Sequence, residues 1–267
     1  MGTMLDSAVP PSAAQIALAK QLYPDLVGWL GYVPTWGRPY IAPGSQGWVA
    51  EAVKVVLDAG LGFFPLLVPF NGDFNSTPSD ITGWQVGVAE ARKLIQDAGG
   101  QFEGCGVNIE APWVVTSSQQ LGWRDRVVLL HEAMGEGEKD AVYGPPSWLA
   151  TLASLGGSAP WSIIAGEWPN GTLAPSPVPS SPVVIPGIPD GEWADPGQRA
   201  WQYQGGHELD QSGLSVDTSV VDDAFPLSKL VPVAPPAPVI TPLDVLKEKL
   251  ALLQSDLQAA IDQANLL

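Results

Sequence analysis

Short apolar runs alternate with longer amphipathic stretches along the first two thirds of the chain. Continuous apolar runs such as Leu26–Val33 and Phe63–Val68 are typical of strands buried on both faces of a parallel sheet. Between them, Ser45–Ala59 repeats its apolar residues at helical spacing. The predicted strands are residues 3–5, 26–33, 63–68, 102–109, 140–143, 161–165, 199–203 and 215–217, and the predicted helices are 12–22, 45–59, 84–98, 118–134 and 147–155.

This order of elements predicts an α/β fold. Helices separate the strands in the first five units, which favours parallel pairing through right-handed crossovers. Eight strands in a chain of this length fit a (β/α)₈ TIM-like barrel. The alternative is an open, doubly wound sheet, but such a sheet normally has a glycine-rich phosphate loop after its first strand, and none is present here.

Two proline-rich stretches interrupt the pattern. Prolines recur through residues 169–198 and exclude regular helix or central strand there, which predicts an extended insert after the sixth strand. A second stretch, residues 226–242, is typical of a polyproline spacer that rises about 3.1 Å per residue. We therefore expect a barrel over residues 1–225, a linker over 226–242 and a C-terminal helix over 243–267.

The C-terminal helix repeats apolar residues with a heptad period. The two core positions are occupied by Leu243, Leu250, Leu257 and Ala264, and by Leu246, Leu253, Ala260 and Leu267. A pattern sustained over nearly four heptads predicts a coiled coil. Its partners would be copies of the same chain, for example in a trimer, or another protein of a larger particle. The alternative is a helix that folds back onto the barrel.

Charge and composition exclude several classes of partner. Asp and Glu number 28 against 12 Lys and Arg, giving a net charge of −16 that disfavours nucleic acids and anionic membranes. No apolar run is long enough to span a bilayer, and Met1–Ala8 lacks the features of a secretory signal. Cys105 is the single cysteine, and His131 and His207 have no cysteine cluster beside them. We expect no disulfide, metal or cofactor.

Polar and aromatic side chains gather at the ends of the predicted strands. In a barrel of this type the functional residues lie at the carboxyl ends of the strands. The candidates are Asp6, Asn108, Glu110 and Asp217 for catalysis, and Trp36, Tyr143, Trp168, Gln202 and Tyr203 for substrate binding. Carboxyl groups beside aromatic rings suit glycoside cleavage, which needs a proton donor, a charge stabiliser and faces that hold sugar rings.

Five short motifs carry a resemblance to a known family. They are Met4-Leu5-Asp6, Gly106-Val107-Asn108-Ile109-Glu110, Ala141-Val142-Tyr143, Ala200-Trp201-Gln202-Tyr203 and Val216-Asp217. In this order they resemble the glycoside hydrolase family 25 muramidases, and more closely the related glycoside-hydrolase-like domain common in actinobacteria and their phages. The resemblance covers about residues 3–225 and implies a muramidase-like barrel.

The resemblance also implies roles for individual residues. Asp6, Glu110 and Asp217 stand where the family has carboxylates, and Glu110 would be the general acid. Asn108 stands where the family has an Asp that holds and polarises the acetamido group of the substrate. Asn accepts a hydrogen bond but brings no negative charge, and losing such a stabiliser costs about 10²–10³ in rate.

Each candidate residue also has an ordinary structural interpretation. Asp6 can cap a local turn, Glu110 can be a solvated loop residue, and Asp217 can bind backbone amides at the barrel rim. For Trp36 and Trp168, packing in the core is the alternative to stacking on a sugar.

Three functions follow from these observations. The first is a virion-associated phage protein of the minor tail type, whose barrel binds host cell-wall or surface glycan with weak or lost hydrolysis. The second is an active peptidoglycan muramidase, either an endolysin or an exported enzyme found outside the cell or in the cell wall. The third is a purely structural module that decorates the virion.

Overall fold

The computed structural model describes two units separately. The first is Met1–Val231, of which residues 1–33, 35–36, 47–68, 77–109, 117–155, 162–166 and 199–231 are described. The second is Pro232–Leu267, in which only residues 247, 250, 254, 255, 258 and 263 are described. The predicted insert over 169–198 lies outside the described residues.

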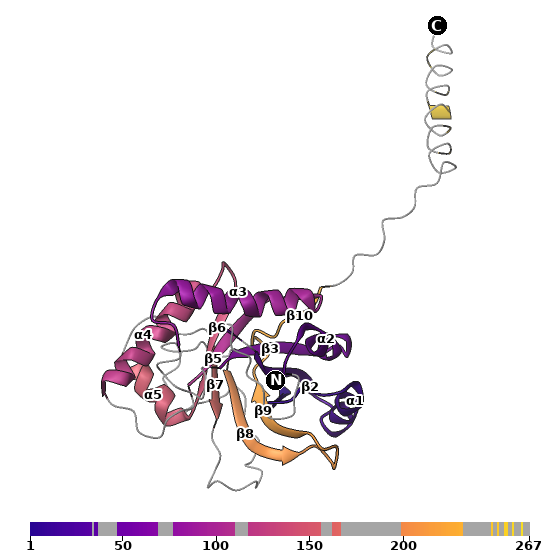
Figure 1. Ribbon diagram of the computed structural model, residues 1–267. Coiled ribbons are helices and arrows are strands. Elements are labelled where there is room, and N and C mark those ends of the chain that lie inside the picture. Colours follow the sequence, from indigo (N-terminus) through magenta and orange to yellow (C-terminus); the bar gives the residue numbers. More distant parts are fainter. Residues whose placement is uncertain are drawn as a thin grey trace. The chain divides into compact units, whose positions relative to one another are not determined.

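Among the described residues of the first unit, eight strands form one closed sheet and five helices lie around it (Figure 1). In sheet order the strands are β1 (Gly2–Ser7), β2 (Leu26–Val33), β3 (Gly62–Leu67), β5 (Gly104–Asn108), β6 (Lys139–Gly144), β7 (Ser162–Gly166), β8 (Arg199–Glu208) and β9 (Ser215–Val221). The helices are α1 (Ala13–Leu22), α2 (Ala50–Asp58), α3 (Ile81–Asp97), α4 (Ser117–Ala133) and α5 (Pro146–Ser154). The predicted α/β class is confirmed.

The direction of the last strand departs from a regular TIM barrel. Neighbouring barrel strands from β1 round to β8 pair in parallel, but β9 runs antiparallel to both β8 and β1 and closes the sheet between them. The prediction of a regular (β/α)₈ barrel is therefore wrong at this strand. Residues 209–214 join β8 to β9 as a short turn, and a parallel crossover needs a dozen or more residues. The sequence places these two strands too close together for any other arrangement.

The ends of the helices follow local chemistry. Ser12 caps α1 by accepting from the Gln15 amide, while the Gln15 side chain accepts from the Ser12 amide, so the two form a capping box. Asp80 caps α3 in the same sense by accepting from the Gly83 amide. Helix α2 begins at Ala50, five residues later than predicted, and no side chain caps it. The prediction from the apolar pattern alone therefore placed the start of this helix too early in the chain.

Two hydrophobic clusters lie on opposite sides of the sheet. The larger one lies outside the barrel, where the helices cover the strands, and includes Trp29, Trp48, Trp84 and Trp123, all fully buried. In Figure 1, α1 and α2 lie on one side, α3 above, and α4 with α5 on the other side of the strands. The smaller cluster fills the barrel interior and includes Met4, Leu30, Phe64, Tyr143 and Phe225.

The chain after β9 closes one end of the barrel. Leu227 lies so close to the interior glycines that a Cβ on Gly28 or Gly62 would come within 2.7 Å or 2.5 Å of its side chain. Ser228 then pairs with Phe63, and β10 (Lys229–Leu230) pairs with the two-residue strand β4 (Gly100–Gln101). Residues 226–231, which the sequence placed in the linker, thus pack against the amino-terminal ends of the strands. The carboxyl ends of the parallel strands lie at the opposite end of the barrel.

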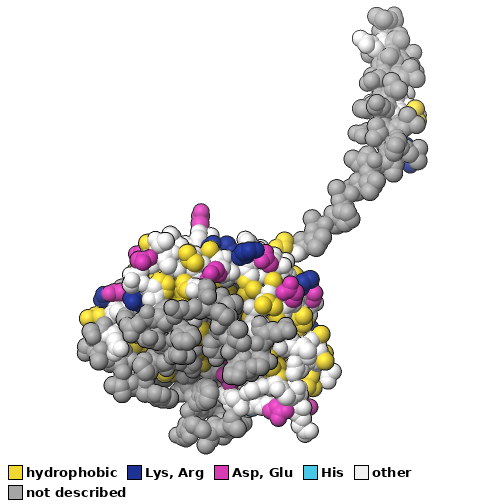
Figure 2. Space-filling view, viewed as in Figure 1, with side chains coloured by type: hydrophobic (Ala, Val, Ile, Leu, Met, Phe, Trp, Pro, Cys, Tyr) yellow, Lys and Arg dark blue, Asp and Glu magenta, His cyan; other side chains and the backbone are white. Residues whose placement is uncertain are grey.

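Charges on the described surface are mixed. Figure 2 shows basic side chains lying beside acidic ones on the face in view. The ion pairs include Lys54 with Asp58 and Lys93 with Asp97, each one helical turn apart. No described helix is long and apolar enough to cross a membrane.

The second unit shows helix at each position that is described. Residues 247, 250, 254, 255, 258 and 263 have helical backbone and exposed side chains, and Leu250 is 57% exposed. The other predicted heptad positions, including Leu243, Leu257 and Leu267, lie outside the described residues, so the coiled coil remains a prediction.

Candidate functional site

Two aspartates meet at the carboxyl end of the parallel strands of the barrel. Asp6 is the next-to-last residue of β1, and Asp217 lies near the start of the antiparallel β9, so both are at the carboxyl end of the parallel strands. The two residues pair directly across the β1–β9 ladder. Asp6 is 3% exposed, and its carboxyl group hydrogen-bonds that of Asp217.

Gln202 bridges the two carboxyl groups from β8. Its side-chain nitrogen Nε2 donates to Asp6 Oδ2 at 3.1 Å and to Asp217 Oδ2 at 2.7 Å. Its oxygen Oε1 accepts from the Tyr143 hydroxyl at 2.5 Å. Because Tyr143 and Gln202 are both fully enclosed, this chain of bonds fixes which end of the amide faces the carboxyl groups.

The geometry of the carboxyl pair favours a proton on one of its two members. Two ionised carboxylates have only acceptors, so a hydrogen bond between them requires a proton on one of them. Burial raises the pKa of Asp217, whereas bonds from the Gly206 amide, Asp6 and Gln202 and the nearby charge of His207 act in the opposite direction. One protonated and one ionised carboxyl is the combination that acid–base chemistry on a glycosidic bond uses.

The backbone of β8 holds the other oxygen of Asp217. The Gly206 N–H donates to Asp217 Oδ1. Gly206 has a φ of +59°, which glycine adopts at low cost, and it lies in a stretch where the β8–β9 register shifts twice. The expectation that Asp217 binds a backbone amide at the rim therefore holds for Oδ1, while Oδ2 faces Gln202 and Asp6. Sequence analysis missed Gly206, because a backbone donor leaves no signal in residue type.

Asn108 and Tyr32 extend the same face of the barrel. Asn108 ends β5, pairs in register with Tyr143 on β6, and is half-buried. Strand alternation places it on the inner side together with Gly106, whose missing Cβ leaves room for Phe64 and Leu66. Tyr32 packs against the interior cluster from β2. Sequence analysis missed Tyr32, although the alternation through Leu30 pointed to it.

Two of the predicted sugar-binding residues lie elsewhere. Tyr203 belongs to the outer cluster, on the opposite side of β8 from Gln202, and burial raises its pKa. The Trp36 indole N–H donates to the Gly83 carbonyl at 3.0 Å, and its ring meets Trp84 edge to face with centroids 5.4 Å apart. The structure thus anchors Trp36 on α3 and does not bring either residue to the carboxyl pair.

The remaining predicted site residues cannot be placed. Glu110 and Trp168 lie outside the described residues. Among the residues that are described, no three His, Cys, Asp or Glu side chains gather as a metal site would require.

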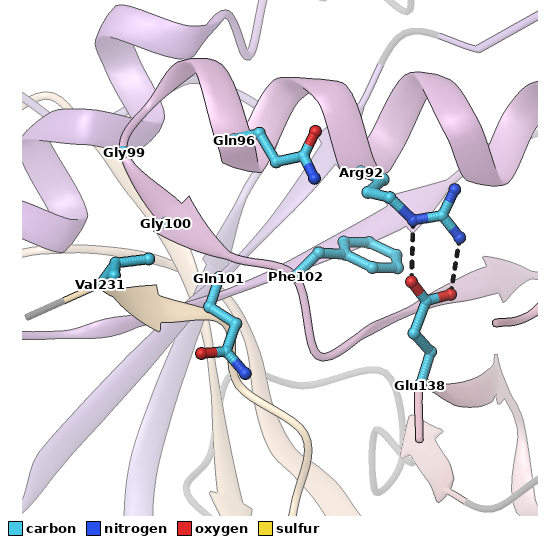
Figure 3. Close-up of a pocket in the computed structure, with 8 residues that line it drawn as sticks. All are labelled: Arg92, Gln96, Gly99, Gly100, Gln101, Phe102, Glu138 and Val231. Atoms are coloured by element: carbon cyan, nitrogen blue, oxygen red, sulfur yellow. Dashed lines mark hydrogen bonds and ion pairs between the residues drawn. The ribbon is translucent and has the colours of Figure 1, made fainter. Parts of the chain in front are cut away.

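A shallow pocket of about 450 Å³ lies at the other end of the barrel. It is lined by Arg92, Gln96, Gly99, Gly100, Gln101, Phe102, Glu138 and Val231. Figure 3 shows Arg92 and Glu138 facing each other, with both hydrogen bonds of the pair drawn. Because each of these charges neutralises the other, the pocket has no group free for acid–base chemistry. The carboxyl pair at the opposite mouth is the stronger candidate.

Comparisons with solved structures show where this fold occurs. The Tat-secreted protein Rv2525c of Mycobacterium tuberculosis, solved with HEPES, is 18% identical, with a TM-score of 0.54, over 85% of this chain and 98% of that one. The catalytic domain of endolysin ply40, from bacteriophage P40 of Listeria monocytogenes, is 15% identical, with a TM-score of 0.53, over 84% and 94%. The virulence factor GHIP of Streptococcus pneumoniae, a glycosyl hydrolase 25, is 8% identical, with a TM-score of 0.52, over 83% and 87%.

These likenesses concern the fold. No family model matches the chain, and no curated protein matches it in sequence. At such low identities the similarity shows a shared backbone architecture and leaves the chemistry to the site itself. The chain therefore shares its fold with proteins that include a glycosyl hydrolase 25 and an endolysin catalytic domain.

Proposed function

We propose that this chain binds a cell-wall or surface glycan at the open mouth of its barrel, with weak or lost hydrolysis. The supporting observation is the buried pair of Asp6 and Asp217, bridged by Gln202. Burying two carboxyl groups side by side destabilises a fold, and such arrangements concentrate at functional sites. A glycan offers hydroxyl and acetamido groups that pair with carboxyl, amide and phenol side chains of this kind.

The weakness of hydrolysis is inferred from Asn108. It lies at the mouth beside Tyr143, where the family resemblance places a carboxylate. A neutral amide there holds a substrate group by hydrogen bonding but does not stabilise positive charge that develops at the anomeric carbon. Binding is thereby retained while the chemical step slows.

The location that we propose is a phage particle, as a minor tail-type protein that meets the host cell wall. The likeness to a phage endolysin domain and to a secreted protein supports a site of action outside the cytoplasm. The heptads over 243–267 support attachment to copies of this chain or to other virion proteins. The exposed Leu250, one of the heptad leucines, offers an apolar contact for such a partner.

A pair of measurements on the full chain tests the proposal. Insoluble peptidoglycan from actinobacterial cells is mixed with the wild type, Asp217→Asn and the control Asp210→Asn, which changes an exposed carboxyl in the β8–β9 turn. We expect the wild type and the control to sediment with the wall, and Asp217→Asn to bind at least tenfold more weakly, a change of about 1.4 kcal/mol. Equal binding by all three proteins would remove the glycan site from this mouth.

Release of reducing ends separates the proposal from an active muramidase. The wild type is expected to release few reducing ends, and Asn108→Asp to raise the rate by about 10²-fold, since one electrostatic stabiliser is restored. High activity in the wild type would favour an active enzyme. Wall binding with no gain from Asn108→Asp would mean that this position does not limit the reaction.

A further inference from the structure

The β8–β9 hairpin is attached to α1 at two points. Tyr23, which follows the last residue of α1, has its hydroxyl oxygen 3.1 Å from His207 Nε2 on β8. Gln15 on α1 donates from Nε2 to the Ser212 carbonyl at 3.1 Å, in the turn of the hairpin. The first contact adjoins Gly206, which binds Asp217, and the second is at the far tip. The hairpin is thus held once beside the carboxyl pair and once away from it.

The segment between these contacts is bulged. From Gln202 to His207 the chain of β8 advances five residues, while its partner β9 advances three, from Ser219 to Val216. Two residues of β8 are therefore extra to the ladder, and Gly206 adopts a φ of +59°. A bulge of this kind turns a backbone group away from its partner strand. Here the bulge directs the Gly206 N–H toward Asp217, where it donates a hydrogen bond to Oδ1.

We propose that Tyr23 and His207 are positioning residues for the glycan site, because their hydrogen bond holds the bulge so that the Gly206 amide fixes the Asp217 carboxyl. Neither side chain needs to touch substrate. The bond acts through one intervening peptide, since His207 follows Gly206 in the chain. The inference rests on the proposed function only in taking Asp217 as part of the site.

The surroundings of Asp217 support a geometric role for His207. Asp217 is approached by Asp6 from β1 and by Gln202, Gly206 and His207 from β8. Burial lowers the pKa of His207, although the charge of Asp217 acts in the opposite direction. A lowered pKa favours the neutral imidazole, whose ring can both donate and accept a hydrogen bond. It acts on the site as a hydrogen-bond partner of Tyr23, with Thr218 Oγ1 a further 3.5 Å neighbour of the same nitrogen.

Nuclear magnetic resonance on the full-length protein tests, without any glycan, whether the contact of Tyr23 with His207 affects the bond from Gly206 to Asp217. Asp carboxyl carbons and backbone amides are labelled, and Asp217→Asn assigns the signals. In the wild type the Gly206 amide proton should shift as Asp217 titrates. Tyr23→Phe removes the hydroxyl and should both reduce this shift and move the pKa of Asp217 upward, because an aligned N–H donor that favours the ionised form is lost.

Gln15→Glu is the matched control. It removes the donor to Ser212 but keeps the acceptor that caps Ser12, so α1 retains its capping box. In this variant we expect the pKa of Asp217 and the titration shift of the Gly206 amide proton to keep their wild-type values. If Tyr23→Phe leaves them unchanged, or if Gln15→Glu moves them equally, the positioning role is wrong. Because no substrate is used, that result would leave the test of glycan binding unaffected.

A second pair of variants covers the case in which Tyr23→Phe does not fold. Gly206→Ala and Gly213→Ala place the same methyl group on glycines of the same hairpin that both have positive φ, +59° and +72°. The backbone strain is similar in kind, but only Gly206 binds Asp217. We expect an upward shift of the Asp217 pKa in Gly206→Ala alone. Equal pKa values in both variants would overturn the proposal.

Discussion

Asp6 and Asp217 face each other across the β1–β9 ladder, where the antiparallel strand β9 meets the first strand of the barrel. Their carboxyl groups share a hydrogen bond, and Gln202 donates to both. The antiparallel direction of β9 is what puts Asp217 at the mouth near its beginning, because a parallel strand would bring its other end there. The carboxyl pair is thus a direct consequence of the strand direction.

Stability should depend on pH through Asp217. Burial raises its pKa in the folded chain above the unfolded value, so between those two values the folded chain binds more protons. The free energy of unfolding should therefore be highest below the unfolded pKa and fall as pH rises through the folded pKa. Urea unfolding at a series of pH values should show this fall in the wild type and a smaller one in Asp217→Asn.

The control for this dependence is Asp210→Asn, in an exposed turn of the same hairpin. It removes one carboxyl without changing the buried pair, and its pH profile should follow that of the wild type. A fall of the same size in Asp217→Asn and the wild type would contradict the assignment to Asp217.

Tyr143→Phe should destabilise the protein by about 1–3 kcal/mol, because it removes the hydroxyl that donates to the buried Gln202 oxygen. Equilibrium denaturation measures the loss. Tyr203→Phe is the comparison, since no hydrogen bond of its hydroxyl is found among the described residues, and it should change stability by about 0.5 kcal/mol or less. Equal losses in the two variants would mean that the bond to Gln202 is not the cause.

Gly28→Ala should cost about 1–3 kcal/mol, because its Cβ would lie 2.7 Å from Leu227 Cδ1 in the closed end of the barrel. Shortening Leu227 makes room, so the double variant with Leu227→Ala should lose less stability than the sum of the single losses. A double-mutant cycle measured by denaturation gives this coupling. The same cycle with Leu230→Ala, an exposed residue of β10, should be additive.

Truncation should separate the barrel from the C-terminal segment. A chain that ends at Val231 keeps Leu227 and β10 and should melt like the full chain, whereas one that ends at Phe225 should lose about 2–5 kcal/mol with the Leu227 side chain. Sedimentation should give a monomer for the chain ending at Val231 and a larger mass for the full chain. The same monomeric mass for both would remove self-association through residues 243–267.

Much of the fold was predictable from local patterns. Strand β2 has the predicted bounds, and α1, α3 and α4 differ from prediction by at most three residues at either end. The cap at Ser12 is also a local feature, because its side chain acts on a residue only three positions away. Asp6, Gln202 and Asp217 were identified as candidates because strand ends are marked by the change from apolar to polar residues.

The sequence by itself determined the order of elements and the strand ends that carry polar residues. Only the tertiary structure decided the partners: Asp6 and Gln202 are 196 residues apart in the chain, and Leu227 reaches glycines of β2 and β3. The short turn over residues 209–214 makes β9 antiparallel to β8, but alternation within a strand does not encode the pairing of β9 with β1 or of Asp217 with Asp6. Those features arise from long-range pairing, which brings distant segments to one barrel mouth.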